Sequence, residues 1–66
     1  MNNKEKLRHL LAHWIEHSRE HTSKYEEWAE KIKDEFPEVA EKLRKAVESF
    51  KEGERMLEEA EKLLGE

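Results

Sequence analysis

The chain has 66 residues and a formal net charge of −4, and 45% of its residues are charged. A chain of this length forms one domain at most, and its acidic balance argues against nucleic acid as the main partner. The absence of cysteine excludes disulfides, thiolate zinc sites and iron–sulfur clusters. There is no apolar run near 18 residues and no signal-peptide pattern, so we expect a cytoplasmic protein without a membrane partner.

Glu, Lys, Leu and Ala dominate the composition, which is typical of long helices. Such richness in Glu and Lys fits either a protein from a thermophile or an engineered helical sequence. Chains this short bury about 60% of their unfolded surface and are marginally stable alone, so a metal or a neighbouring chain usually helps them.

The first predicted element is one helix from about residue 5 to residue 36, with Asn2 or Asn3 as its N-cap. Apolar residues recur along it at intervals of three and four, with no Gly or Pro, and fill an arc of roughly 140°. These apolar positions are Leu7, Leu10, Leu11, Trp14, Ile15, Tyr25, Trp28, Ala29, Ile32 and Phe36.

Pro37 ends the first helix, because proline disfavours helical geometry in the preceding residue and suits the first turn of a new helix. We expect the chain to reverse at about residues 36–38; a sharp kink is the alternative. The second helix is predicted from about residue 38 to residue 64, with apolar steps that alternate four and three as in coiled coils and bundles. Its stripe is Val39, Leu43, Ala46, Phe50, Gly53, Leu57, Ala60 and Leu64.

The apolar pattern of the first helix is interrupted once, between Trp14 and Tyr25. The inward positions there are the polar residues Ser18, His21 and Thr22. A buried polar layer lowers stability unless its groups are paired. Such a layer is usually kept for register, for a switch or for a ligand.

Gly53 is the only glycine predicted inside a helix, and it occupies a core position. If the hairpin turns near residues 36–37, His21 faces roughly Glu52 and Gly53. A glycine here costs about 1 kcal/mol relative to alanine. It therefore indicates close backbone approach, or room for a ring, a water molecule or a ligand.

All four histidines of the chain, His9, His13, His17 and His21, are spaced four residues apart. Imidazoles at positions i and i+4 of a helix can chelate one metal ion. Each step of four advances about 40° around the helix, so the row runs from solvent at His9 to the apolar side at His21. Because His9 and His21 lie ~18 Å apart along the axis, one ion cannot take all four. We therefore predict a metal site at His13, His17 and His21.

Further ligands are expected from Glu16 or Glu20 on the same helix, from Glu52 opposite, or from a histidine of another chain. Histidine and carboxylate ligands favour zinc, nickel, cobalt or copper(II). In the simpler alternative the outer histidines are ordinary surface residues and His21 is a satisfied polar core residue. A haem held by His21 of two chains, with Gly53 making room, is less favoured.

A catalytic site is not predicted, and we expect no enzyme. The sequence offers no nucleophile with a clear base, no Gly-rich phosphate loop and no di-iron motif on separate helices. The segment from His13 to Glu16 shows His-x-x-Glu, which reverses the order of the di-metal bundle motif.

The string HWIEHSREH followed by KYEEWAEK resembles a small family of bacterial and archaeal helical-hairpin domains with a motif close to H-W-I-E-H-N-x-x-H. The resemblance implies a hairpin fold and a loose link to nickel or other metal handling. Ser18 departs from the Asn of the motif, Tyr25 from the usual Phe, and His9 lies outside it. The matching residues are His13, Trp14, Ile15, Glu16, His17, His21, Tyr25, Trp28 and Ala29.

These features predict an all-α, antiparallel two-helix hairpin. The first helix carries more apolar area than one partner helix covers, so we expect a homodimer that forms a four-helix bundle; docking on a larger protein is the alternative. The predicted function is transition-metal buffering or delivery, with a metalloprotein as a candidate recipient. The rival hypothesis is a structural or protein-interaction module whose helices only oligomerise.

Overall fold

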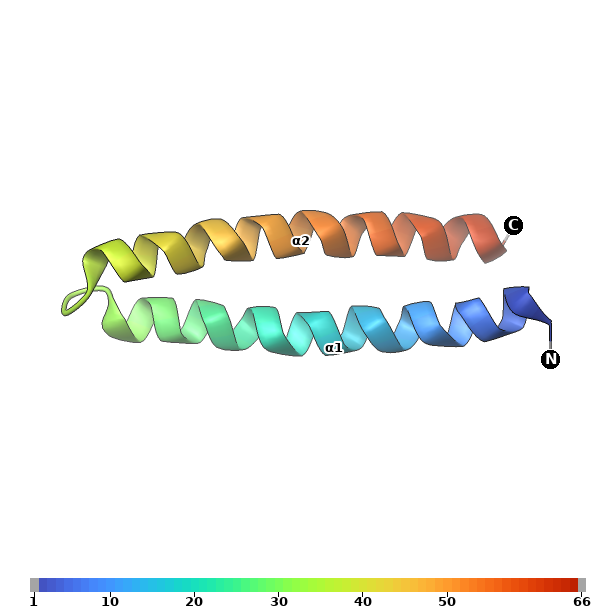
Figure 1. Cartoon of the computed structure of the whole chain (residues 1–66), viewed down its shortest axis with the longest axis horizontal. Coiled ribbons are helices and arrows are strands. Elements are labelled where there is room, and N and C mark those ends of the chain that lie inside the picture. The colour runs from blue at the N-terminus through green and yellow to red at the C-terminus, as the bar shows by residue number, and fades with distance from the viewer. Residues whose placement is uncertain (1, 66) are drawn as a thin grey trace.

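The computed structural model describes residues 2–65 as two α-helices joined by a short turn (Figure 1). α1 spans Asn3–Ile32 and α2 spans Pro37–Gly65. The helices lie antiparallel and side by side, and both chain ends lie at the end opposite the turn. The all-α hairpin predicted from the sequence is therefore confirmed. Neither described helix is both long and apolar enough to cross a lipid bilayer.

Side chains at both ends of α1 make local contacts that support the helix. The Glu5 N–H donates to Asn2 Oδ1 at 2.9 Å, so Asn2 is the N-cap. At the other end, Lys33 Nζ donates to Glu30 Oε1 at 2.6 Å. This hydrogen bond lowers the pKa of Glu30 below its ordinary value and raises that of Lys33 above its own.

The turn begins earlier than expected, because α1 ends at Ile32 rather than near residue 36. Residues 33–35 form the turn, and the Phe36 N–H donates to the Ile32 carbonyl at 2.7 Å. The Phe36 carbonyl then accepts the Ala40 N–H at 2.9 Å. Pro37 thus occupies the first position of α2, where its missing N–H has no helical partner to lose.

The helices meet along a narrow seam of mostly small or branched side chains. Residues spaced seven apart line it on each helix, as expected for helices that cross at a shallow angle. Two polar residues, Thr22 and Glu54, are buried within it, with exposed fractions of 3% and 7%. The buried residues are Leu11, Ile15, Thr22 and Ala29 of α1 and Ala40, Val47 and Glu54 of α2.

Several residues expected in the core lie outside this seam, which corrects the predicted packing. Trp14, Trp28 and Phe50 have exposed fractions of 45%, 55% and 45%. Both helices carry two neighbouring columns of residues spaced seven apart, and either column alone looks like a packing stripe. The hairpin packs through the column of Ile15 on α1 and that of Val47 on α2, one step around from the column expected.

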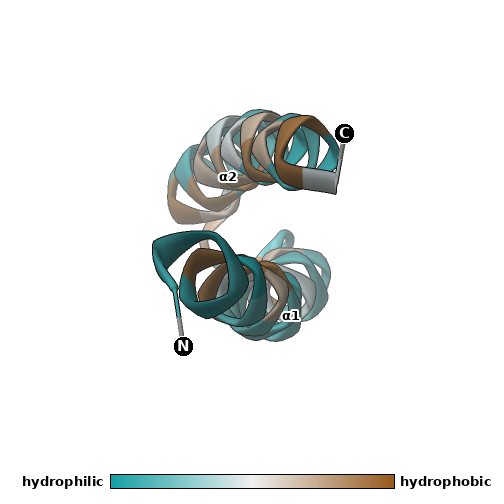
Figure 2. Ribbon diagram, turned by 90° about the vertical axis from the view of Figure 1, so that its right-hand side faces the viewer, coloured by the Kyte–Doolittle hydropathy of each residue, from teal (hydrophilic) through white to brown (hydrophobic). Residues whose placement is uncertain are grey.

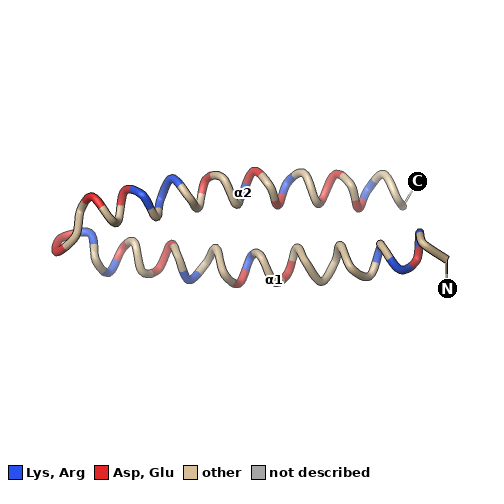
Figure 3. The backbone as a smooth tube through the Cα atoms, viewed as in Figure 1, with Lys and Arg blue, Asp and Glu red and all other residues tan. Residues whose placement is uncertain are grey.

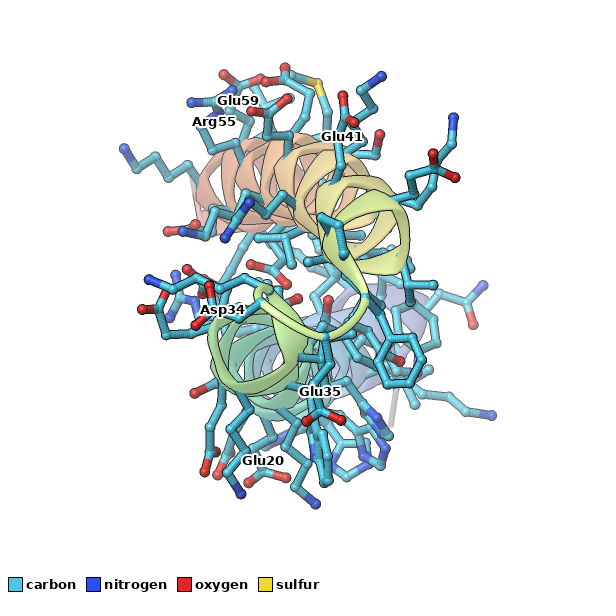
Figure 4. The ribbon with its side chains drawn as sticks, turned by 90° about the vertical axis from the view of Figure 1, so that its left-hand side faces the viewer. Glu20, Asp34, Glu35, Glu41, Arg55 and Glu59 are labelled. Carbon is cyan, nitrogen blue, oxygen red and sulfur yellow. The ribbon has the colours of Figure 1, made fainter. Side chains whose placement is uncertain are left out.

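The hairpin has two unlike broad faces. Across the charged face, Arg19 pairs with Glu58 at 2.9 Å and Lys51 with Glu26 at 3.2 Å. Hydrophobic and hydrophilic segments alternate along both helices (Figure 2), and charged residues recur along both apart from a stretch in the N-terminal half of α1 (Figure 3). Ring side chains gather on one side of the helices, at the lower right of Figure 4.

We call this second side the aromatic face. The Tyr25 and Phe50 rings meet across it with centroids 5.6 Å apart. Helical spacing of about 100° per residue places the other members on the same side. The aromatic face comprises Leu7, Leu10, Trp14, His17, His21, Tyr25 and Trp28 of α1 and Val39, Leu43, Ala46, Phe50, Gly53, Leu57 and Ala60 of α2.

Candidate functional site

Three histidines form a continuous row of exposed rings along α1, which we call the histidine column: His13, His17 and His21. The His13 and His17 ring centroids lie 5.8 Å apart, edge to face. Those of His17 and His21 lie 4.7 Å apart and are stacked. The unbroken helix holds this order, because each i+4 step stacks one side chain over the preceding turn. His17 is the central member and belongs to both neighbouring pairs.

His21 does not point between the helices, which corrects the expected inward position. It is exposed, whereas Thr22 beside it is buried. Thr22 falls in the seam column, and His21 falls in the neighbouring column with Trp14. Gly53 is likewise exposed, and a Cβ added there would meet nothing within 4 Å. His21 and Gly53 therefore lie on the aromatic face and not in a shared core layer.

A buried polar layer does exist, but its third member is Glu54. The Ser18 hydroxyl donates to Glu54 Oε2 at 2.6 Å, and Thr22 Oγ1 lies 2.7 Å from the same oxygen. Thr22 Oγ1 also lies 2.9 Å from the Ser18 carbonyl, so its one hydrogen is shared between two acceptors. Across residues 2–65, each buried side-chain nitrogen or oxygen has a hydrogen-bond partner. The layer is satisfied without a ligand.

The burial of Glu54 was not predicted from the sequence, because a glutamate in a Glu-rich helix is normally expected to face solvent. The available signal is its spacing of seven and fourteen residues from Val47 and Ala40, both of which are buried. That column continues the seam, so a carboxylate in it has to find donors on α1. Ser18 and Thr22 are hydroxyl donors one helical turn apart, and they supply those hydrogen bonds.

A small hollow of about 260 Å³ opens on the aromatic face above the polar layer. Its walls combine rings with hydroxyl groups, so it can accept a ring with a polar edge or a hydrated group. The hollow lies at the His21 end of the histidine column. It is lined by Ser18, His21, Thr22, Tyr25 and Phe50.

The carboxylates predicted as further ligands do not gather around the histidine column within one chain. Glu16 and Glu20 line a groove that they share with Arg19, a residue of the charged face. Glu52 is exposed on α2 and pairs with Arg55 on the same helix. Among residues 2–65, no group of three or more His, Asp or Glu side chains is placed to hold a metal ion. A single chain thus offers pairs of imidazoles.

These features define a small helical-hairpin domain with an exposed ring-bearing face. The chain belongs to the family described as Domain of unknown function (DUF8180), which matches residues 7–64. An uncharacterized protein of Archaeoglobus fulgidus is 48% identical over 61 residues, which cover 92% of this chain and 98% of that protein. No solved structure matches the chain. The family match spans both helices, so the hairpin as a whole is the shared unit.

Proposed function

We propose that the protein binds a transition-metal ion through the histidine column, His13, His17 and His21, and serves to buffer or deliver that ion. The ring spacing carries the proposal. Two imidazoles bound to one tetrahedral zinc ion at about 2.0–2.1 Å have ring centroids roughly 5 Å apart. The two centroid distances in the column, 5.8 Å and 4.7 Å, bracket that value. Each pair can therefore close on an ion by side-chain rotation alone.

The ligand set favours borderline divalent ions, which are zinc, nickel, cobalt and copper(II). Glu16 follows His13 by three residues, and Glu20 follows His17 by three, so a rotated carboxylate can join either pair. Water completes an open site of this kind. Because a metal-bound imidazole must be unprotonated, affinity should fall as the pH drops through the range in which histidine ordinarily titrates.

Isothermal titration of the protein with zinc, nickel and copper(II) at about pH 7.5 tests the proposal. We expect at least one ion to bind more tightly than about 0.1 mM. His17→Ala should weaken binding at least about tenfold, since His17 belongs to both pairs. His9→Ala is the matched control, because it removes an exposed histidine outside the column. Binding weaker than about 0.1 mM for every ion, or unchanged binding by His17→Ala, would overturn the proposal.

A second candidate function is protein interaction without metal, and the exposed aromatic face favours it. The large exposed apolar side chains of this face have exposed fractions from 37% at Leu10 to 55% at Trp28. Contiguous exposure of this kind marks interaction surfaces. An interaction module predicts the same association state in the presence of a chelator. It also predicts unchanged melting after all four histidines are replaced.

A further inference from the structure

Each helix carries a second column of residues, spaced seven apart, outside the hairpin seam. The two outer columns differ sharply in size. The α1 column holds two tryptophans and a histidine, whereas the α2 column holds two alanines and a glycine. In order, the outer columns are Leu7, Trp14, His21 and Trp28 on α1 and Val39, Ala46, Gly53 and Ala60 on α2.

The contacts between the helices fix which residues lie at the same height along the hairpin. Tyr25 contacts Phe50, and Glu26 contacts Lys51. In an antiparallel pair, residues at equal height have numbers with a constant sum, here about 75. Equal heights therefore pair three of the four α1 residues, all but Leu7, with a small residue of the α2 column. The pairs are Trp14 with Ala60, His21 with Gly53, and Trp28 with Ala46.

We propose that a second copy of this chain docks on the aromatic face about a two-fold axis parallel to the helices, with both turns at the same end. Such an axis keeps every residue at its height and sets α1 of each copy against α2 of the other. Trp14 then faces Ala60 of the second copy, and Trp28 faces its Ala46. Large residues meet small ones at these three levels, which is how bundle layers interdigitate.

The aromatic face is large enough for a stable dimer. The Cα trace measures 50 × 15 Å in the plane of this face, a projected area of about 750 Å². A standard protein interface buries about 800 Å² on each partner. Trp14 and Trp28 are near half exposure at opposite sides of its centre. Buried tryptophans commonly carry most of the binding energy at such interfaces.

The other face-to-face arrangement packs the outer columns poorly. A two-fold axis across the helices would set α1 against α1 and place Trp14 opposite Trp28 of the second copy. Gly53 would then face its own counterpart. Two facing tryptophans keep the two α1 helices far apart, whereas two facing glycines let the two α2 helices approach closely. One rigid pair of faces cannot give both contacts the usual spacing of about 8–10 Å.

The arrangement also changes the metal site, and this step alone rests on the proposed function. His21 of each copy faces Gly53 of the other, and the neighbouring Glu52 comes to the height of His21 at the interface rim. Glu52 of the second copy thereby adds a carboxylate at the His21 end of the histidine column, where no group of three ligands is placed among residues 2–65 of one chain. The dimer then has two equal sites and binds one ion per chain. The crossed arrangement would gather His17 and His21 of both copies into one site, with one ion per two chains.

Disulfide trapping tests the arrangement directly, because the chain has no cysteine of its own. The double variant His21→Cys/Gly53→Cys, oxidised in metal-free buffer, should give a covalent dimer. The single variants His21→Cys and Gly53→Cys should stay uncross-linked, since like positions lie across the bundle from each other. Glu48→Cys, exposed on α2 away from the aromatic face, is the background control. Circular dichroism confirms that each variant is helical.

Efficient cross-linking of either single variant would overturn the proposal in favour of the crossed arrangement. An intrachain disulfide in the double variant, or no disulfide at all, would contradict it too. Sedimentation equilibrium of the unmodified chain gives a second readout that needs no cysteine. We expect a dimer that Trp28→Ala weakens at least about tenfold, and a monomer at about 0.1 mM would refute docking. A trapped dimer that binds no metal would leave the docking intact and refute only the metal function.

Discussion

We predict that the buried hydrogen bonds among Ser18, Thr22 and Glu54 stabilise the folded hairpin. Thr22→Val keeps the size and branching of the side chain and removes only the hydroxyl. Glu54 Oε2 then loses the donor 2.7 Å away and keeps only Ser18, at 2.6 Å. A hydrogen bond to a charged group contributes about 1.5–3 kcal/mol, and Glu54 is too buried for water to replace it fully. We expect the free energy of unfolding to fall by about 2 kcal/mol.

Urea unfolding followed by circular dichroism measures this loss, at one fixed protein concentration because association contributes to apparent stability. For a chain of this size, about 2 kcal/mol corresponds to a fall in Tm of roughly 8–16 °C. Ser49→Ala, an exposed hydroxyl removed from α2, should change stability by less than about 0.5 kcal/mol. A Thr22→Val variant as stable as the wild type would refute the reasoning that this layer holds the hairpin together.

Three further variants test the contributions of Gly53, of the helix cap and of the buried polar layer to stability. Gly53→Ala should stabilise the isolated chain by about 1 kcal/mol, since its new Cβ meets nothing within 4 Å. The same variant should weaken dimerisation in sedimentation equilibrium. Unchanged dimerisation would contradict the placement of Gly53 opposite His21 of the second copy. Asn2→Ala should cost about 1 kcal/mol in urea unfolding through loss of the cap, with Asn3→Ala as control. Replacing all of Ser18, Thr22 and Glu54 by Ala, Val and Leu should restore or exceed wild-type stability, because no buried polar group then lacks a partner.

Much of the fold followed from residue spacing and from one proline. The three-and-four spacing and Pro37 correctly predicted two long antiparallel helices and the start of the second helix, whereas the turn lies at residues 33–35, slightly before the predicted position. The polar break at Ser18 and Thr22 correctly predicted a buried polar layer. The sequence also indicated that the first helix carries more apolar area than one partner helix covers, and Trp14 and Trp28 are left about half exposed in the hairpin.

The choice of seam could not be made from the sequence. A wide apolar stripe contains two columns spaced seven apart, and both satisfy the same periodicity. On α1 the seam column of Ile15, Thr22 and Ala29 lets two backbones approach more closely than the tryptophan column does. On α2, however, the column of Ala46, Gly53 and Ala60 is the smaller of the two, so side-chain volume does not identify the seam on both helices. Placing the tryptophan column of α1 and the Ala46 column of α2 in the seam shifted His21 and Gly53 inward by one column. Glu54 was not predicted to be buried, because it lies outside the predicted stripe of α2.

The histidine column lies beside the buried polar layer on the same turns of α1. Ser18 and Thr22 bond to Glu54 in the seam, while His17 and His21 stand beside them on the surface. These hydrogen bonds hold the turns of α1 that carry His17 and His21 against α2. The ligands of a metal site here would be positioned by the helix and not by loops.

Thermal melting with and without metal tests the central claim most directly. At a free ion concentration of about one hundred times Kd, binding stabilises the folded chain by about 2.7 kcal/mol. We therefore predict that zinc or nickel raises the Tm by roughly 10–20 °C above the value in chelator. His17→Ala should lose at least about half of this rise, because tenfold weaker binding leaves about 1.4 kcal/mol of stabilisation, and His9→Ala should keep it. Identical melting with ion and with chelator, or a full rise in His17→Ala, would contradict metal binding by the histidine column.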